Sequence, residues 1–389
     1  MSKCKCVPLS ENVEEMFIGP FGSSLKNECF VNENEAFCMV YEQKHAIQKT
    51  MNVETRYVNE KKYNELKRFN VQAGDIIVSC RGTIGETYII PEGAPLGIMH
   101  PSIMKIRLKK DVYDKYFFNL LLKSRLKKHE KEANGSGVKM AISATELGKE
   151  LFPVPTMAEQ QKITKIISQV RCVIDKRKQE LEYLDKLVKA RFVEMFGNPF
   201  DVKTKVKWPI KTICDLSESI MDGSNVDKAL YKQNGDVLFL RIQNVWCNEF
   251  KLEDSVYISE IENEEYKDTS LKHGDLLITK IGRYYTSDSS LGRVSVYLGD
   301  DDKANYSNNI MRIRFKDGIN SEFINTLMNL DDYNKFIRRT SVGGTDKRAL
   351  SKGLISSYPI IVPPSDKQNE FVDFLHQVDK SKFIYSHIT

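Results

Sequence analysis

The sequence contains the same pattern twice, and this repetition constrains the fold more strongly than any other feature. Residues 74–79 read GDIIVS, and residues 274–279, 200 positions further on, read GDLLIT. More blocks recur in the same order, with an offset that drifts only to 208. Small insertions explain such a drift, whereas chance matches would not keep their order. The other matches are residues 103–107 with 310–314, Gly135, Lys139 and Ser143 with Gly343, Lys347 and Ser351, Val154-Pro155 with Val362-Pro363, and Gln160 with Gln368.

Each copy begins with a stretch rich in strands and loops. In the first copy we expect strands at 75–80, a short apolar run entered through Gly-Asp, and at 103–107, where side chains alternate. A basic helix is expected at 113–131, followed by a Gly-rich loop at 134–139 and a strand that ends at Pro155. This order of elements indicates an α/β (mixed α+β) class, built as two tandem domains.

A long helix is expected after the first copy. Thr156 and Glu159 have the spacing of a capping box, and Gly197 is placed to end the helix. About forty residues at ~1.5 Å each give a rod of roughly 60 Å, too long for one small domain to cover. Its apolar residues recur at spacings of four and three, as in a coiled coil. They are Ile163, Ile167, Val170, Ile174, Leu181, Leu184 and Val188, with Arg177 interrupting the series.

A second helix is expected after the second copy, with Ser365 and Gln368 in the same capping relation. Phe371, Phe374 and Val378 continue its apolar face. An apolar stripe is compatible with ordinary core packing, but two copies of one helix can pair antiparallel about a pseudo-twofold axis. We therefore expect a first domain at 1–155, a central helix at 156–197, a second domain at 198–364, and a C-terminal helix at 365–389 that pairs with the central one.

Composition narrows the functional classes. A net charge of +5 permits nucleic-acid binding without proving it. No apolar run reaches the ~20 residues of a membrane helix, and the first residues lack the apolar core of a signal peptide. We therefore expect a cytoplasmic protein whose eight cysteines are reduced thiols. Cys4 and Cys6 lack further ligands at zinc spacing, so no metal or cofactor is expected.

Catalytic motifs are missing from the sequence. Residues 198–200 (NPF) lack the second proline of an amino-methyltransferase motif and read as a turn that follows the long helix. There is no phosphate-binding GxxxxGK[ST] loop, and residues 42–44 (EQK) have nuclease-like spacing without a convincing aspartate before them. The six histidines lie far apart in sequence, with no defensible Ser/His/Asp arrangement. We expect a protein without catalytic activity of its own.

Polar and basic residues in the loops are the remaining candidates for function, because loops on a rigid scaffold often carry recognition residues. Arginine and lysine can bind guanine edges or phosphates, and glutamine or asparagine can pair with adenine. Each such residue can equally be a solvated loop charge. The candidate DNA-binding residues are Ser23, Ser24, Lys26, Gln43, Lys44, Arg81, Thr83 and Lys139 in the first copy, and Arg241, Gln243, Asn244, Lys280, Arg283, Lys347 and Arg348 in the second.

The duplicated motifs resemble those of the specificity subunit of type I restriction-modification enzymes. The resemblance rests on the repeated Gly-Asp strand, the Gly-rich loop with Lys139 or Lys347, and the proline-ended strand before a glutamine-bearing helix. It implies two target-recognition domains, each reading one half of a split, asymmetric site in double-stranded DNA. It also implies that the two helices act as a ruler and bind two DNA methyltransferase subunits, to which a restriction/translocase subunit can attach.

One departure from the family pattern is the length of the second helix. About twenty residues follow Ser365, half the length of the first helix, so part of the central helix lacks its expected partner within the chain. This puts the usual methyltransferase contact in doubt, or leaves room for another subunit. The alternative function is a non-enzymatic coiled-coil adaptor that binds proteins. A self-contained nuclease or methyltransferase is disfavoured by the missing motifs.

Overall fold

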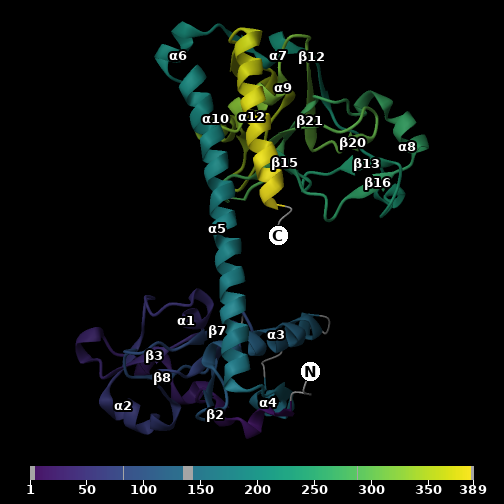
Figure 1. Ribbon diagram of the computed structural model, residues 1–389. Coiled ribbons are helices and arrows are strands. Elements are labelled where there is room, and N and C mark those ends of the chain that lie inside the picture. The colour runs from purple at the N-terminus through teal and green to yellow at the C-terminus, as the bar shows by residue number, and fades with distance from the viewer. Residues whose placement is uncertain (1–4, 82, 135–142, 287, 387–389) are drawn as a thin grey trace. The chain divides into compact units, whose positions relative to one another are not determined.

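The computed structural model describes residues 5–81, 83–134, 143–286 and 288–386, in two compact units that comprise residues 1–173 and 174–389 (Figure 1). The boundary between them falls inside the long helix α5 (Met157–Phe196). Each unit has its own hydrophobic core and its own sheets. The two units are called unit 1 and unit 2 below.

Unit 1 is built around a four-stranded antiparallel sheet in the order β2-β9-β6-β7. The strands are β2 (Val13–Ile18), β9 (Ile103–Leu108), β6 (Ile76–Ser79) and β7 (Thr87–Ile89). A second sheet has the order β4-β3-β8-β5, with β3 and β8 parallel. Its strands are β4 (Tyr57–Val58), β3 (Cys38–Tyr41), β8 (Gly97–Met99) and β5 (Asn70–Val71), and β1 (Cys6–Pro8) pairs with β10 (Leu151–Pro153). The helices before α5 are α1 (Gln43–Gln48), α2 (Glu60–Glu65), α3 (Lys115–Asn134) and α4 (Ala144–Lys149).

Unit 2 repeats this arrangement. Its main sheet has the order β12-β21-β17-β19, from β12 (Ser217–Asp222), β21 (Ile310–Phe315), β17 (Leu276–Thr279) and β19 (Val294–Val296). Its second sheet joins β16 (Val256–Ile258), β13 (Val237–Leu240) and β20 (Ala304–Tyr306), with β13 and β20 parallel. The pair β11 (Ile210–Thr212) and β24 (Pro359–Ile361) matches β1 and β10. Additional strands are β14 (Val245–Trp246), β15 (Glu249–Phe250), β18 (Ile281–Arg283), β22 (Val342–Gly343) and β23 (Lys347–Ala349), and the helices are α6 (Val202–Lys207), α7 (Ile213–Leu216), α8 (Glu260–Glu265), α9 (Ser321–Met328), α10 (Asp331–Thr340), α11 (Lys352–Ser356) and α12 (Ser365–Ser386).

The duplication is confirmed down to the strand register. The edge strands β2 and β12 each contain a register shift, between Val13 and Glu15 in one and between Ser217 and Ser219 in the other. The fold class, mixed α/β in two copies, is also confirmed. A shared irregularity at the same place in both sheets shows that the two units follow one structural plan.

The repeated Gly-Asp motif has a structural reason in both units. Asp75 and Asp275 are buried, and each carboxylate is bound at both oxygens by an arginine from the neighbouring central strand. Arg107 donates to Asp75 through Nε and Nη2 at 2.7 Å each, and Arg314 donates to Asp275 at 2.8 and 2.7 Å. Each aspartate also accepts a backbone N–H from the turn before it, at 2.9 and 2.7 Å. These contacts hold the start of the strand against the sheet centre.

The start of each long helix is held by a buried glutamine. Gln160 accepts from the backbone N–H of Asp114 at 2.8 Å and donates to two carbonyl oxygens. Gln368 donates to the Pro363 carbonyl at 2.8 Å and accepts from the Asn320 N–H at 3.3 Å. The predicted capping box of α5 is confirmed, because the Thr156 N–H and the Glu159 N–H each donate to the other's side chain.

The predicted cap of the second helix is wrong. Ser365 is the first residue inside α12, and its hydroxyl donates to the Gly318 carbonyl, while Gln368 contacts Pro363 and Asn320. Two prolines precede Ser365, and the Gln368 N–H donates to the carbonyl of Pro364, which starts the helix. Pro364 thus occupies the N-cap position, and Ser365 is the first helical residue and not the cap.

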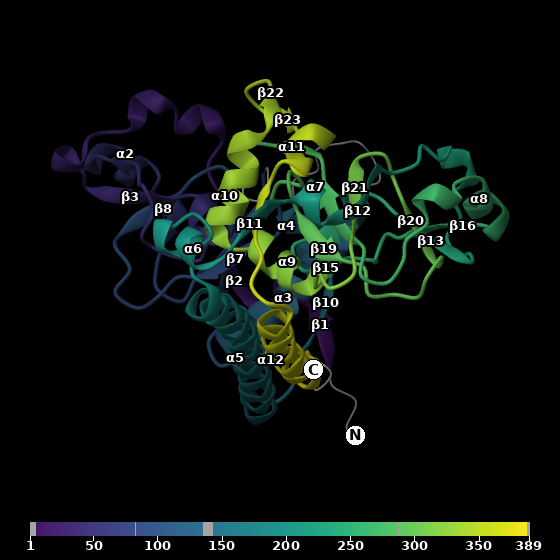
Figure 2. The same cartoon turned by 90° about the horizontal axis from the view of Figure 1, so that it is seen from above.

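Within unit 2, α12 packs antiparallel against the last turns of α5 (Figure 2). Phe371, near the start of α12, meets Phe192 and Phe196, near the end of α5, edge to face, with ring centroids 5.1 and 5.9 Å apart. Lys382, near the end of α12, bonds Asp185 of α5 at 2.8 Å. Gly197 adopts φ 81°, as predicted for the residue that ends the helix.

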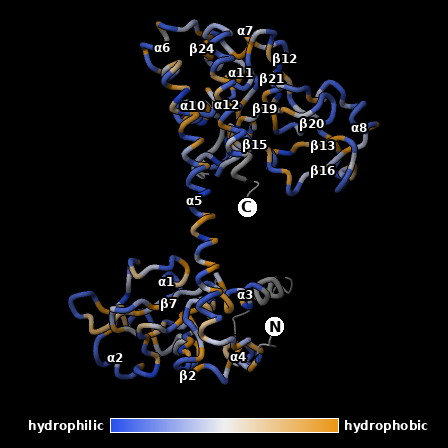
Figure 3. The backbone as a smooth tube through the Cα atoms, viewed as in Figure 1, coloured by the Kyte–Doolittle hydropathy of each residue, from blue (hydrophilic) through white to orange (hydrophobic). Residues whose placement is uncertain are grey.

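Only part of the predicted heptad seam is covered. Leu184 and Val188 pack into the core of unit 2, whereas Ile163 and Val170 expose 38% and 52% of their surface. Hydrophilic and hydrophobic stretches alternate along α5 (Figure 3). The exposed first half of the seam agrees with the expectation that the short second helix leaves part of α5 without a partner in the described chain.

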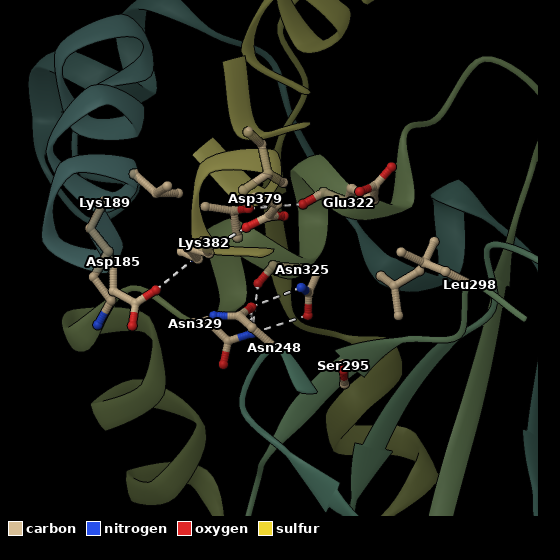
Figure 4. A pocket seen from close by; sticks show the side chains of 14 residues that line it. Asp185, Lys189, Asn248, Ser295, Leu298, Glu322, Asn325, Asn329, Asp379 and Lys382 are labelled. Atoms are coloured by element: carbon tan, nitrogen blue, oxygen red, sulfur yellow. Dashed lines mark hydrogen bonds and ion pairs between the residues drawn. The ribbon is translucent and has the colours of Figure 1, made fainter. Parts of the chain in front are cut away.

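Polar groups also join the helices of unit 2. A small pocket of about 130 Å³ lies among α5, α9 and α12. On its floor, Asn325 and Asn329 both donate to the Oδ1 of Asn248 at 2.8 Å (Figure 4). Lys382 and Asp185 line the same pocket. The asparagines join the turn between β14 and β15 to α9, and the Lys382–Asp185 ion pair joins α12 to α5.

Candidate nucleic-acid interface

In unit 2, the loops that follow β12, β13 and β20 come together at one edge of the sheets. The N–H of Ser307 donates to the Leu240 carbonyl at 2.9 Å, and that of Ser224 donates to the Tyr306 carbonyl at 2.9 Å. Gly223 permits this approach, because a Cβ there would collide with the carbonyl oxygens of Tyr306 and Ser307. The loops enclose a hollow of about 810 Å³. It is lined by Asn225, Val226, Asp227, Lys228, Tyr231, Arg241, Ile242, Gln243, Ser307, Asn308 and Asn309.

A second hollow of about 550 Å³ continues from the first and shares Ile242 and Asn309 with it. Its other walls come from β18, from Thr286 and residues 288–290, and from β23. Arg283 and Lys347, two of the residues predicted from sequence, line it. The two hollows form one polar surface, called the unit 2 loop face below.

Asn244, another predicted contact residue, is buried and holds the loop that carries Arg241 and Gln243. Its Oδ1 accepts from the Arg241 N–H at 3.0 Å, and its Nδ2 donates to Lys251 O at 2.9 Å and to Asp254 Oδ1 at 3.0 Å. Asp254 also bonds both loop side chains, Arg241 through an ion pair of 3.3 Å and Gln243 at 3.1 Å. Asn244 thus positions the loop, and its neighbours Arg241 and Gln243 line the larger hollow.

Replacing Asn244 by alanine should cost about 1–3 kcal/mol of the unfolding free energy of unit 2, because the partly buried Arg241 N–H and the Lys251 carbonyl lose their bonds to the buried amide. Chemical denaturation followed by tryptophan fluorescence would measure the loss. Gln243→Ala is the matched control, since Gln243 is exposed and its removal should change stability by no more than about 0.5 kcal/mol. Equal effects of the two substitutions would remove the positioning role.

The remaining predicted cations of unit 2 are, with one exception, bound to neighbours. Lys280 bonds Asp222 at 2.6 Å, and Arg283 lies 3.7 Å from Asp346. The Arg348 guanidinium lies over the Tyr284 ring, 4.0 Å from its centre. Lys347 is exposed, with no ion pair among the residues that the structure describes. The region therefore holds a mixture of paired and free cations.

Unit 1 builds an equivalent surface from the loops after β2, β3 and β8, called the unit 1 loop face below. The His100 N–H donates to the Tyr41 carbonyl at 2.8 Å, as Ser307 does to Leu240 in unit 2. A Cβ on Gly19 would collide with the His100 carbonyl, as one on Gly223 would with Ser307. Arg81 and Thr83 follow β6, where the Cys80 N–H donates to Ser102 O at 2.9 Å and joins that loop to the others.

The predicted residues of unit 1 differ in exposure. Ser23 and Lys26 are exposed and Ser24 is half-buried, on the loop after β2. Gln43 and Lys44 begin α1 and are half-buried, and Lys44 bonds Glu42 at 2.9 Å. Arg81 and Thr83 are exposed, and Lys139 lies outside the described residues. Arg56, which was not among the residues predicted from sequence, also pairs with Glu42.

His45 takes the place of Asn244 in unit 1. Its Nδ1 accepts from the Glu42 N–H at 3.0 Å, the same bond that Asn244 makes to the loop of unit 2. Burial is the main cause that lowers the pKa of His45, opposed by its contacts with Glu42. Burial also lowers the pKa of His100, opposed by Glu42 and assisted by Arg56, Arg81 and Lys44. His100 is joined to the start of this loop by its N–H bond to the Tyr41 carbonyl, and Lys44 and Arg56 pair with Glu42, the next residue.

Unit 1 should lose stability as the pH falls below about 6.5, the ordinary pKa of histidine. Below this pH the two histidines bind protons in the unfolded chain more readily than in the folded unit. The stabilisation is therefore complete above pH 6.5 and is lost as the pH falls towards the lower pKa of the folded unit. His45→Asn, which copies the arrangement of unit 2, should make this loss shallower. Unfolding curves on both sides of pH 6.5 would measure the slope, and an unchanged slope would refute the assignment to His45.

Several residues of the two loop faces were missed from the sequence. They are Asn225, Lys228, Tyr231, Asn308 and Asn309 in unit 2 and Phe21, Arg56 and His100 in unit 1. The available signal was the repeat itself, because loops that follow equivalent strands must lie at equivalent edges.

Among the described residues, no group of three or more histidine, cysteine, aspartate or glutamate side chains is placed to hold a metal ion. Within the same residues, no helix combines the length and apolar character needed to span a bilayer.

Comparison with known protein families finds one described as "Type I restriction modification DNA specificity domain", which matches residues 11–184 and 205–387. The two matched stretches coincide with the two copies of the fold. They cover most of the chain.

Two relatives come from Methanocaldococcus jannaschii. The chain is similar to the type I restriction enzyme MjaIX specificity subunit, with 23% identity over 241 residues, 58% of this chain and 55% of the relative. It is also similar to the MjaVIII specificity subunit, with 21% identity over 330 residues, 80% of this chain and 74% of the relative. The chain thus spans about half of the first relative and about three quarters of the second.

The fold is similar to that of a chain in a solved structure described as the structural basis underlying complex assembly and conformational transition of the type I R-M system. The TM-score is 0.57 at 13% sequence identity, and the match covers 100% of this chain and 94% of the other. At this identity the likeness concerns the fold alone.

Proposed function

Because this chain belongs to the family of type I restriction-modification DNA specificity subunits, we propose that unit 1 and unit 2 each read one half of a bipartite, asymmetric site in double-stranded DNA. The family is that of the non-catalytic, sequence-choosing component of the enzyme. The chain would therefore act by binding, and catalysis would belong to its partners. The same proposal places the protein in the cytoplasm.

The observation that carries this proposal is the contrast between the scaffold and the loops. Strand order, register shift and the buried aspartate–arginine pair are the same in both units. The side chains on the loop faces differ, with Arg241 and Gln243 where unit 1 has Glu42 and Lys44. Base edges in the major groove are distinguished by such donor and acceptor groups. Two copies of one scaffold that display different side chains are suited to recognise two different half-sites.

The proposal assigns to the loop residues the roles expected of a DNA reader. Exposed cations such as Arg81 and Lys347 would contact phosphates and supply affinity. Gln243 and the neighbouring amides would contact base edges. The ion pairs of Lys280, Arg283 and Lys44 with their own carboxylates would be exchanged for phosphate or base contacts on binding.

We also propose that the long helix carries the DNA methyltransferase subunits, two in number, with a restriction/translocase subunit attached through them. The exposed apolar residues in the first half of α5 support a protein partner there. The likeness to a chain whose structure concerns complex assembly of the type I R-M system agrees with this. A coiled-coil adaptor without DNA contact is the alternative function.

The test is a selection of DNA duplexes from a random library by the full chain, purified together with its methyltransferase subunit. We expect one bipartite sequence with a fixed spacer. Exchanging the segment before Thr156 for that of a relative should change one half of the enriched sequence and leave the other half intact. A chain that enriches no sequence, while still binding its protein partner, would favour the adaptor.

A further inference from the structure

We infer that Phe21 reads a thymine in the half-site of unit 1, through apolar contact with the 5-methyl group of that base. This inference rests on the proposed function and adds a specificity-determining residue to it. The starting observation is exposure. Phe21 is 87% exposed, the highest value among the large hydrophobic side chains of the described chain.

The backbone under Phe21 is firmly held, so the exposed ring has a defined position. The preceding residue, Pro20, is buried, and so is Leu25, four residues later. The Phe21 carbonyl accepts from the Ser24 N–H at 2.8 Å, which closes the short turn. Gly19 lies against the His100 backbone and its N–H donates to Ile103 O at 2.9 Å. The ring therefore projects from the surface on a turn that the sheet anchors.

The repeat identifies the surface on which the ring lies. Gly19 and Gly223 occupy equivalent positions, since a Cβ on either would strike the carbonyl at the end of the neighbouring loop. Counting two residues onward places Phe21 where unit 2 has Asn225. Asn225 lines the larger hollow of the unit 2 loop face. Phe21 therefore belongs to the unit 1 loop face.

The surroundings of Phe21 suit a nucleic-acid groove. Its loop contacts the His100 turn, and the His100 N–H donates to Tyr41, the residue before Glu42. Lys44 and Arg56 pair with Glu42, and Arg81 is exposed on the loop after β6. On the proposed function, Phe21 therefore shares its surface with the polar and basic loop residues that would contact DNA. When DNA lies on this face, the cations would contact phosphates and the ring would be free to contact the bases.

The chemistry of the ring selects the base. A phenyl ring has no hydrogen-bond donor or acceptor for the polar groups of the base edges. In the major groove, the apolar feature that distinguishes one base from another is the thymine 5-methyl group. Asn225, at the equivalent place in unit 2, carries an amide that can pair with adenine instead. The same loop would thus read an A·T pair through different bases in the two units.

The test begins with the bipartite site selected by the full chain in the presence of its methyltransferase subunit. Each thymine is then replaced singly by deoxyuridine, which lacks only the methyl group, and the dissociation constant is measured for wild type and Phe21→Ala. At one thymine of one half-site, we expect deoxyuridine to weaken wild-type binding about fourfold, the effect of removing one buried methyl group. Phe21→Ala should bind the two duplexes equally.

Two further variants make the result specific. Phe21→Leu keeps an apolar side chain and should retain part of the discrimination. Asn225→Ala should weaken discrimination in the other half-site and leave the deoxyuridine effect at the Phe21 position unchanged. Because Phe21 is exposed, its replacement should leave thermal unfolding unchanged, which would show that each variant is folded.

The outcomes separate this inference from the proposed function. A wild-type chain that enriches no sequence would overturn the proposed function itself. An enriched bipartite site at which deoxyuridine weakens wild type and Phe21→Ala equally would overturn the thymine contact alone. So would a half-site without thymine, or a kinked DNA in which Phe21 is inserted between base pairs and the methyl group has no effect.

Discussion

Replacing Asp275 by alanine is expected to lower the unfolding free energy of unit 2 by about 3–5 kcal/mol, the cost of removing one partner of a buried ion pair. Asp275 is 1% exposed, and both of its oxygens bind Arg314. Without the carboxylate, the guanidinium and the Lys272 N–H lose their partner at the centre of the sheet. Urea denaturation, with the transition of each unit followed separately, would measure the change.

The repeat provides the matched experiment for this prediction. Asp75→Ala removes the equivalent carboxylate and should lower the transition of unit 1 instead. Glu264→Ala breaks an exposed pair with Lys267 and should leave the midpoint of unit 2 unchanged. A loss below about 1 kcal/mol for Asp275→Ala, or an equal shift of both transitions, would show that the pair does not hold the sheet.

Raising the monovalent salt from about 50 to about 200 mM is expected to weaken binding of the selected DNA site roughly a hundredfold. Lys26, Arg81, Lys228 and Lys347 lie on the loop faces or on the loops that form them, and within the described chain none has an ion pair. Four phosphate contacts release counterions with a slope of about −0.9 each against log salt, which gives this loss. Titrations at several salt concentrations would measure the slope.

A variant with alanine at these four positions should bind weakly and show a much flatter salt dependence. Lys110→Ala with Lys316→Ala is the control, because these exposed lysines follow the far ends of β9 and β21, away from the loops. Their removal should leave the slope close to that of wild type. A quadruple variant with an unchanged slope would show that the DNA phosphates meet some other surface.

Much of the frame could be predicted because it depends on local patterns. The Gly-Asp strands, the Thr156 capping box and the glycine that ends α5 are each fixed by a few neighbouring residues. Because the sequence repeats at a nearly constant offset, a prediction made for one unit could be applied to the equivalent residues of the other. The helix expected at 113–131 was also close to the observed bounds of α3.

Predictions that depended on tertiary contacts were less successful. The strand expected at 103–107 was found, but its pattern did not show that Lys105 is fully buried and bonds Glu15 at 2.6 Å and Asn70 O at 2.7 Å. Ser365 looked like a helix cap, but the prolines before it start the helix. No local pattern reports which distant carboxylate or carbonyl will meet a side chain.

The candidate interface was only partly accessible from sequence. The basic loop residues could be named, but Asn244 could not be recognised as a buried support, nor Phe21 and Asn225 as residues of the loop faces. Loops have no periodicity from which a facing direction follows. Whether the predicted residues contact DNA stays a prediction.

The buried aspartate–arginine pair of each unit has a consequence for how such a chain can change over generations. Neither partner lines the hollows of unit 2, so the groups that keep the sheet folded are separate from those displayed to a ligand. Substitutions at the rim can accumulate with little penalty in stability. A preference for a new ligand can therefore arise by point mutation on the loop face of one unit, while the fold of that unit and the loop face of the other unit stay the same.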